Sequence, residues 1–221
     1  MEFSNDIASK PWPRFTGKED RMPCSSRLAE LIAARIFHDL GSPMAGITAL
    51  LPQLADPAAA AIVAETAAEL RARMKLFSTS FGQGDELGWH EAPALLSGAP
   101  MAHRVRFELP KAEGMLNAGR ARLLLSAILL AAEALPRGGL VRVSQDDAGW
   151  LSLLPEGRDA AWSPVFVELL AGGAMEDALA AGPRRVLAPW VIAQAEEQGA
   201  ELSLSLALAA SMPPLRIGPS A

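Results

Sequence analysis

The sequence predicts an α+β fold in which an antiparallel helical hairpin is followed by an α/β sandwich. Two long helical patterns separated by prolines predict the hairpin, and an apolar helical segment flanked by alternating strand patterns predicts the sandwich. A chain of 221 residues with 50% hydrophobic content can bury a core of this size. We divide the chain into a disordered leader (residues 1–24), the hairpin (25–82), the sandwich (83–215) and a tail (216–221).

The first helix is predicted over residues 25–51, with Ser25 or Ser26 as its N-cap and Pro52 shortly after its end. Apolar side chains recur every three or four positions and form one stripe along this helix. The stripe consists of Leu28, Ile32, Ile36, Leu40, Met44, Ile47 and Leu51.

The second helix is predicted to begin at Pro57, with Asp56 as its N-cap, and to run to about Phe81 before Gly82 and Gly84. The two helices form an antiparallel hairpin, and a lone hairpin cannot bury its apolar stripe from both sides. We therefore expect a homodimer in which two hairpins form a four-helix bundle.

The second half of the chain alternates between strand and helix patterns. Asn117 is a suitable N-cap for an apolar helix, and a turn around Gly149 joins two strands into an antiparallel hairpin. Pro189 is an irregularity inside the last predicted helix. The predicted strands cover residues 103–109, 140–144, 150–154 and 202–208, and the predicted helices cover residues 118–135, 164–170 and 184–198.

Composition and charge exclude several functional classes. The net charge of −5 argues against nucleic acid as a partner. The longest charge-free stretch, residues 40–55, is broken by glycine and prolines, so no membrane helix is expected. Cys24 is the only cysteine, the three histidines lack metal-ligand spacing and residues 1–22 lack a secretory signal pattern. We therefore expect no metal site and a cytoplasmic location.

The pair His38-Asp39 is the candidate catalytic site. His38 lies roughly 180° from the middle of the apolar stripe, among small side chains that a second macromolecule can approach. Asp39 can accept one ring N–H and leave the other ring nitrogen with its lone pair, which makes the imidazole a usable nucleophile. Pro43 is expected to kink the helix just after this pair. The same residues also fit an ordinary surface pair on a helix that ends at a proline.

The pattern His-Asp-x-x-x-Pro, from His38 to Pro43, resembles the phosphoacceptor motif of two-component histidine kinases. The second half of the chain resembles their ATP-binding GHKL domain, through residues 123–139 with their Pro-x-Gly-Gly turn. When that turn is aligned, the two asparagines of the kinase motif fall at Ser126 and Leu130, and its basic residue falls at Glu133. Leucine offers magnesium no oxygen ligand and glutamate repels a triphosphate, so we expect a degenerate GHKL domain that binds no ATP.

The combination of these features over about residues 28–208 resembles the ChpT family of bacterial histidine phosphotransferases. The resemblance implies a phosphorelay, in which His38 takes a phosphoryl group from one response-regulator receiver domain and passes it to another. It also implies that magnesium lies on the receiver, so this chain needs no cofactor. We expect the receiver to contact Arg35, Gly41, Ser42 and Arg71, near the height of His38 in the hairpin.

Two alternatives remain open at this point. A pseudokinase scaffold would bind a receiver or regulator through the hairpin without being phosphorylated, and His38 would then be dispensable. A working histidine kinase with an unusual ATP site would bind nucleotide in the presence of magnesium, although Leu130 and Glu133 argue against it.

Overall fold

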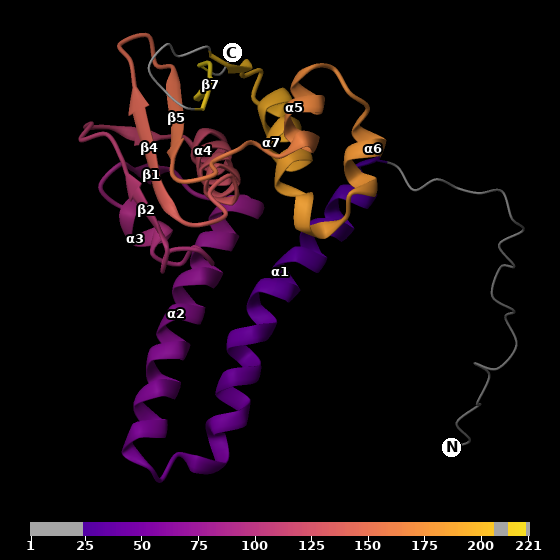
Figure 1. The fold of residues 1–221 in the computed structure, drawn as a ribbon. Coiled ribbons are helices and arrows are strands. Elements are labelled where there is room, and N and C mark those ends of the chain that lie inside the picture. The colour runs from indigo at the N-terminus through magenta and orange to yellow at the C-terminus, as the bar shows by residue number, and fades with distance from the viewer. Residues whose placement is uncertain (1–23, 206–211, 220–221) are drawn as a thin grey trace, which may run out of the picture.

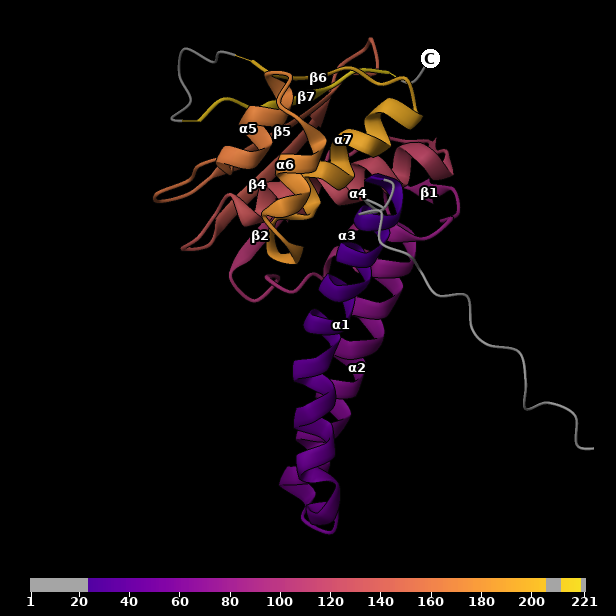
Figure 2. The ribbon, with the colours of Figure 1, turned by 90° about the vertical axis from the view of Figure 1, so that its right-hand side faces the viewer.

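The computed structural model describes residues 24–205 and 212–219, and the predicted leader therefore lies outside the described residues except for Cys24. Helices α1 (Cys24–Leu50) and α2 (Pro57–Phe81) form an antiparallel hairpin that projects from a sandwich of sheet and helices (Figures 1 and 2). A short 3₁₀ helix, η1 (Leu51–Gln53), joins them at the far tip. The mixed α+β architecture predicted from the sequence is confirmed.

Local sequence signals account for the ends of the hairpin helices. Asp56 caps α2 by accepting a hydrogen bond from the backbone N–H of Ala58, and Pro57 takes the first helical position, as predicted. Ser25 and Ser26 both lie within α1, so neither predicted serine is its N-cap. It continues as an α-helix through Pro43. None of the helices formed by the described residues is both long and apolar enough to cross a membrane.

The sandwich contains a five-stranded sheet in the order β2-β4-β5-β7-β6. The β2–β4 pair is parallel and the other pairs are antiparallel, which confirms the predicted strand hairpin β4–β5. A second, two-stranded sheet pairs β1 (Leu87–Gly88) with β3 (Met115–Leu116) and was not predicted. The strands of the main sheet are β2 (Val105–Glu108), β4 (Gly139–Gln145), β5 (Leu151–Glu156), β6 (Leu202–Leu204) and β7 (Leu215–Ile217).

Helices α4 (Ala118–Glu133) and α7 (Leu187–Glu197) form the helical part of the core. Asn117 caps α4 through the backbone N–H of Arg120, as predicted. Pro189 lies in the first turn of α7, where backbone N–H groups have no partner within the helix, so it causes no irregularity. The shorter helices are α3 (Ala92–Leu96), α5 (Pro164–Leu170), α6 (Met175–Ala180) and the 3₁₀ helix η2 (Pro183–Arg185).

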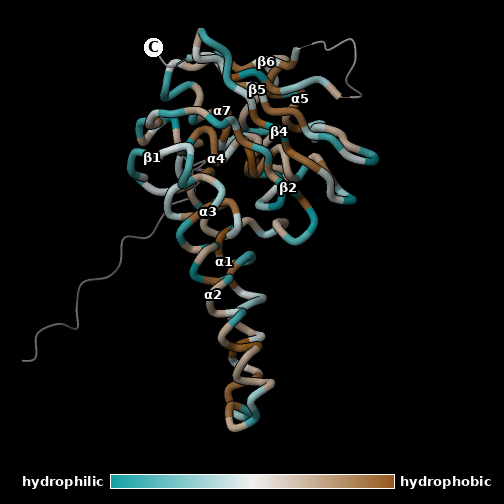
Figure 3. The backbone as a smooth tube through the Cα atoms, turned by 90° about the vertical axis from the view of Figure 1, so that its left-hand side faces the viewer, coloured by the Kyte–Doolittle hydropathy of each residue, from teal (hydrophilic) through white to brown (hydrophobic). Residues whose placement is uncertain are grey.

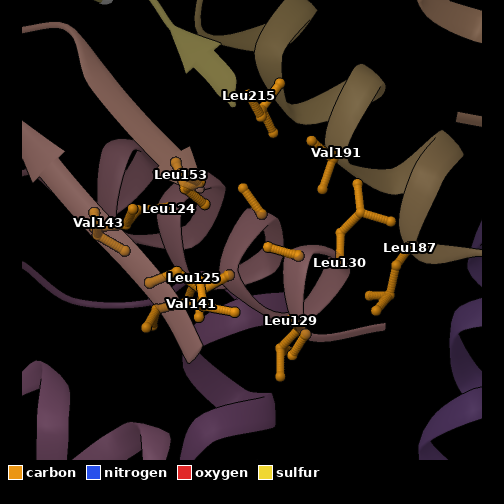
Figure 4. Close-up of a cluster of buried hydrophobic side chains, with 14 of the residues drawn as sticks. Leu124, Leu125, Leu129, Leu130, Val141, Val143, Leu153, Leu187, Val191 and Leu215 are labelled. Carbon is orange, nitrogen blue, oxygen red and sulfur yellow. The ribbon is translucent and has the colours of Figure 1, made fainter. Parts of the chain in front are cut away.

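The core is centred on α4, which is buried on every side along most of its length. Figure 4 shows its leucines between side chains of the sheet, such as Val141 and Leu153, and side chains of α7, such as Val191. Leu76 and Phe77, near the upper end of α2, belong to the same core. The hairpin is therefore packed onto the sandwich through continuous apolar burial.

The prediction that residues 216–221 form a tail is wrong. Strand β7 runs from Leu215 to Ile217 and therefore crosses the predicted boundary after residue 215. Leu215 and Ile217 are completely buried, and β7 pairs with both β5 and β6. The buried guanidinium of Arg120, in the first turn of α4, donates hydrogen bonds to the carbonyls of Ile217 and Gly218. Burial lowers the pKa of Arg120. Of the predicted strand 202–208, residues 206–208 lie outside the described residues.

We expect Ile217→Ala to lower the free energy of unfolding by about 3 kcal/mol, because it opens a cavity in a completely buried position. Urea denaturation followed by circular dichroism measures the change, with Pro219→Ala, at the exposed end of the described chain, as the control. An unfolding free energy equal in the two variants would mean that β7 adds nothing to the core.

Candidate functional site

The candidate site is built around His38, whose side chain is 67% exposed on α1. Its Nδ1 lies 3.0 Å from Oδ1 of Asp39, and the Asp39 side chain is only 10% exposed. An ionised carboxylate can only accept a hydrogen bond, so Nδ1 carries the proton and donates it. The Nε2 atom then keeps its lone pair on an exposed ring, and this geometry is compatible with the nucleophilic role that stays a prediction for His38.

Asp39 is itself held by two arginines from different helices. The Nε of Arg35, one turn earlier on α1, lies 2.6 Å from Oδ2 of Asp39. Arg73, on α2, donates a hydrogen bond of 2.9 Å to the backbone carbonyl of Asp39. That carbonyl is available because Pro43, four residues later, has no N–H to donate. Pro43 thus creates an acceptor that the second helix of the hairpin occupies.

Arg35 also reaches into the sandwich. One of its terminal nitrogens lies 2.7 Å from Oε1 of Glu133 at the end of α4, and both side chains are mostly buried. Burial alone would lower the pKa of Arg35, but the charges of Glu133 and Asp39 outweigh it and raise that pKa. Burial raises the pKa of Glu133, while Arg35 and, more weakly, Arg185 favour its ionised form. Arg35 is therefore a permanent cation shared by two carboxylates.

The guanidinium of Arg35 is already occupied within the chain, and its expected contact with a receiver stays a prediction. The structure also brings Arg73, rather than Arg71, to the site. Arg71 is exposed but lies two residues before Arg73, and that spacing points it to another side of α2. Arg73 was not among the residues expected to contact the receiver. The role of Arg73 depends on the carbonyl freed by Pro43. The sequence shows that this carbonyl is free, but it does not show which residue of the second helix lies opposite to it.

Gly41 and Ser42 are exposed on α1, one turn beyond His38. A methyl group added at Gly41 would meet no other atom of the described structure within 4 Å, so the surface beside the histidine is open. These two positions are accessible, and their contact with a receiver stays a prediction.

Two polar residues of α4, Arg122 and Ser126, contact the end of α2. The buried hydroxyl of Ser126 donates to the carbonyl of Ser80, near the end of α2, at 3.0 Å. The Nε1 of Trp190, on α7, lies 3.0 Å from the Ser126 hydroxyl and 3.1 Å from the same carbonyl. Arg122 donates to the carbonyl of Gly82 at 3.3 Å. Helix ends leave carbonyls without partners, and here α4 and α7 supply the donors.

A groove of about 490 Å³ runs along the hairpin between α1 and α2. On α1 it is lined by Ile32, Ile36 and Leu40, which lie roughly opposite to His38 on the helix. Figure 3 shows hydrophobic stretches along the hairpin and at its far tip. Exposed apolar side chains of this hairpin and its tip include Phe37, Met44, Leu51, Leu54, Ile62 and Met74.

No group of three or more histidine, cysteine, aspartate or glutamate side chains in the described part of the chain is arranged to hold a metal ion. The sequence-based expectation that the site needs no metal of its own stays a prediction.

Comparison with known proteins places the chain among phosphotransferases. Residues 89–209 match the model of the histidine phosphotransferase C-terminal domain. The protein phosphotransferase ChpT of Brucella abortus (strain 2308) is 28% identical over 188 residues, which cover 80% of this chain and 89% of that protein. A solved structure of a bacterial phosphotransferase superposes with a TM-score of 0.70 at 25% identity, over 89% of this chain and 97% of that one.

We expect Arg35→Met to lower the free energy of unfolding by about 3 kcal/mol, because it leaves the mostly buried carboxylates of Asp39 and Glu133 without their shared cation. The matched control is Arg27→Met, which breaks an exposed ion pair with Glu30 on the same helix and should cost less than about 1 kcal/mol. Urea titrations of both variants make the comparison. Equal losses would show that the shared cation contributes no more than a surface pair.

Proposed function

This chain belongs to the histidine phosphotransferase family, and we propose that His38 is the residue that carries the phosphoryl group between receiver domains of response regulators. The observation that carries the proposal is the hydrogen bond of 3.0 Å between Nδ1 of His38 and Asp39, on an exposed ring. Of the three histidines, His38 alone has a ring nitrogen bonded to a carboxylate of the described residues.

The transfer needs no proton movement at the attacking atom. The lone pair of Nε2 attacks the phosphorus of a phosphoaspartate on the donor receiver, an N–P bond forms and the aspartyl O–P bond breaks. The bonding electrons leave with the aspartate carboxylate. Nδ1 keeps its proton, so the phosphorylated ring is an imidazolium, and the carboxylate of Asp39 stabilises that charge. The reverse sequence of steps delivers the group to the second receiver.

The receiver would approach the exposed side of α1 at Gly41 and Ser42. Arg184 and Arg185 are exposed and lie near Arg35 and Glu133. The carbonyl of Arg184 accepts a hydrogen bond of 3.5 Å from Arg35, and the charge of Arg185 acts on Glu133. Cations here complement an acidic phosphorylation pocket on the receiver. In this proposal the receiver holds the magnesium ion that neutralises the phosphoryl oxygens, and this chain supplies the nucleophile.

We propose that residues 25–82 act as the dimerisation and phosphotransfer hairpin, and that two copies pair through the groove opposite to His38. The apolar groove, with the exposed Met74 in its lining, and the further exposed apolar side chains elsewhere on the hairpin support a four-helix bundle. A partner hairpin in this groove would cover apolar surface and leave His38 accessible.

The sandwich is proposed to be a degenerate GHKL domain that binds no ATP. At the aligned positions, the Ser126 hydroxyl is occupied by Ser80 and Trp190, Leu130 is buried and apolar, and Glu133 is paired with Arg35. These groups do not fit a magnesium-bound triphosphate, because none of them is a free oxygen ligand or a cation.

We expect His38→Gln to abolish the acceptance of ³²P from a phosphorylated receiver, because glutamine has no nucleophilic ring nitrogen. His90→Gln, which changes another exposed histidine, should accept phosphate at the wild-type rate. Label on the His38→Gln protein would contradict the proposal, and wild-type protein that binds receivers but never carries label would favour the non-phosphorylated scaffold.

The dimer is tested by Met74→Glu, which places a carboxylate on the exposed apolar lining of the groove. We expect the dimer dissociation constant to rise at least ~10-fold, because a partner hairpin would have to bury this unpaired charge. Sedimentation velocity over a concentration series measures it. Met115→Glu, at an exposed methionine on β3, is the matched control, and equal dissociation constants in the two variants would place the interface elsewhere.

A further inference from the structure

We infer that Glu133 is a positioning residue for the phosphoryl transfer, because it holds the Arg35 guanidinium in the orientation that fixes Asp39 and, through Asp39, the tautomer of His38. The inference rests on the proposed function of His38. It assigns to the sandwich a part in the chemistry at the hairpin.

Three consecutive contacts connect Glu133 to His38. Glu133 Oε1 lies 2.7 Å from a terminal nitrogen of Arg35, Arg35 Nε lies 2.6 Å from Asp39 Oδ2, and Asp39 Oδ1 lies 3.0 Å from His38 Nδ1. The side chains of Glu133, Arg35 and Asp39 are 16%, 13% and 10% exposed, so solvent screens the first two contacts only weakly. His38, at the end of the series, is the exposed member.

The geometry requires an anchor on the far side of Arg35. A guanidinium is a planar fork, so fixing one arm fixes the direction of the others. Glu133 occupies one terminal nitrogen, and Nε is then directed at Oδ2 of Asp39. With Oδ2 occupied, Oδ1 is the atom that accepts the proton of His38 Nδ1. Without the charge of Glu133, Arg35 can turn away, Asp39 can rotate, and either ring nitrogen of His38 can carry the proton.

The experiment uses the full-length chain and the variant Glu133→Gln, which keeps the size of the side chain and removes its charge. Long-range ¹H–¹⁵N correlation spectra distinguish protonated from unprotonated ring nitrogens and report the tautomer of His38 directly. The rate of phosphoryl acceptance is measured with a phosphorylated receiver and with phosphoramidate, a small donor that needs no receiver docking. Glu197→Gln, which breaks the ion pair of 3.0 Å between α7 and Arg122 of α4, is the control.

We expect wild type and Glu197→Gln to show the Nδ1–H tautomer, and Glu133→Gln to show a mixture with acceptance slowed about 10-fold from both donors. Arg35→Gln and the double variant Arg35→Gln/Glu133→Gln should be slowed to the same extent as Glu133→Gln, because Glu133 acts through Arg35. Two outcomes would overturn the inference. One is a double variant whose rate of phosphoryl acceptance falls by the product of the two single fold-changes, and the other is an unchanged tautomer and rate in Glu133→Gln.

Should Glu133→Gln fail to fold, Glu133→Asp carries the same test, because it keeps the charge and withdraws the carboxylate by one methylene. A mixed tautomer is then the supporting result and a single Nδ1–H tautomer the contrary one. A wild-type protein that accepts no phosphoryl group would refute the proposed function instead, since the tautomer measurement does not depend on phosphorylation.

Discussion

The guanidinium of Arg35, held between Asp39 on its own helix and Glu133 on α4, is the interaction on which the rest of the site depends. Through its two ion pairs, this one side chain joins the exposed part of α1 to the buried helix α4. Removing a carboxylate pair and a cation from water is costly, and the hydrogen bonds between them offset that cost only when all three groups are in place. The arrangement therefore fixes how the upper hairpin sits on the sandwich.

Helices and strands with strong local signals could be predicted from the sequence. The caps at Asp56 and Asn117 and the alternation in β4 and β5 depend on neighbouring residues, so they gave correct positions. The short elements β1, β3 and β7 could not be predicted, because two or three residues carry no periodic pattern. The sequence suggested a tail after residue 215, whereas β7 forms there because it pairs with β5 and β6.

The candidate site was predictable to the extent that it is local. His38 and Asp39 are adjacent in sequence, and their hydrogen bond follows from that adjacency and from the helix. The partners of Asp39 and Arg35 come from elements distant in the chain. Glu133 was predicted only as a residue that repels triphosphate, because its attraction to Arg35 requires the hairpin to be docked on α4. Long-range pairing of charges has no periodicity that a single sequence reveals.

The hydrogen bond from Arg73 to the carbonyl that Pro43 leaves free limits where α2 can gain or lose residues. A residue inserted into α2 between the tip and Arg73 would move Arg73 by about 1.5 Å along the helix and rotate it by about 100° about the helix axis. Either movement takes Arg73 away from its acceptor. The number of residues in the exposed lower part of α2 is thus constrained by a backbone atom beside His38.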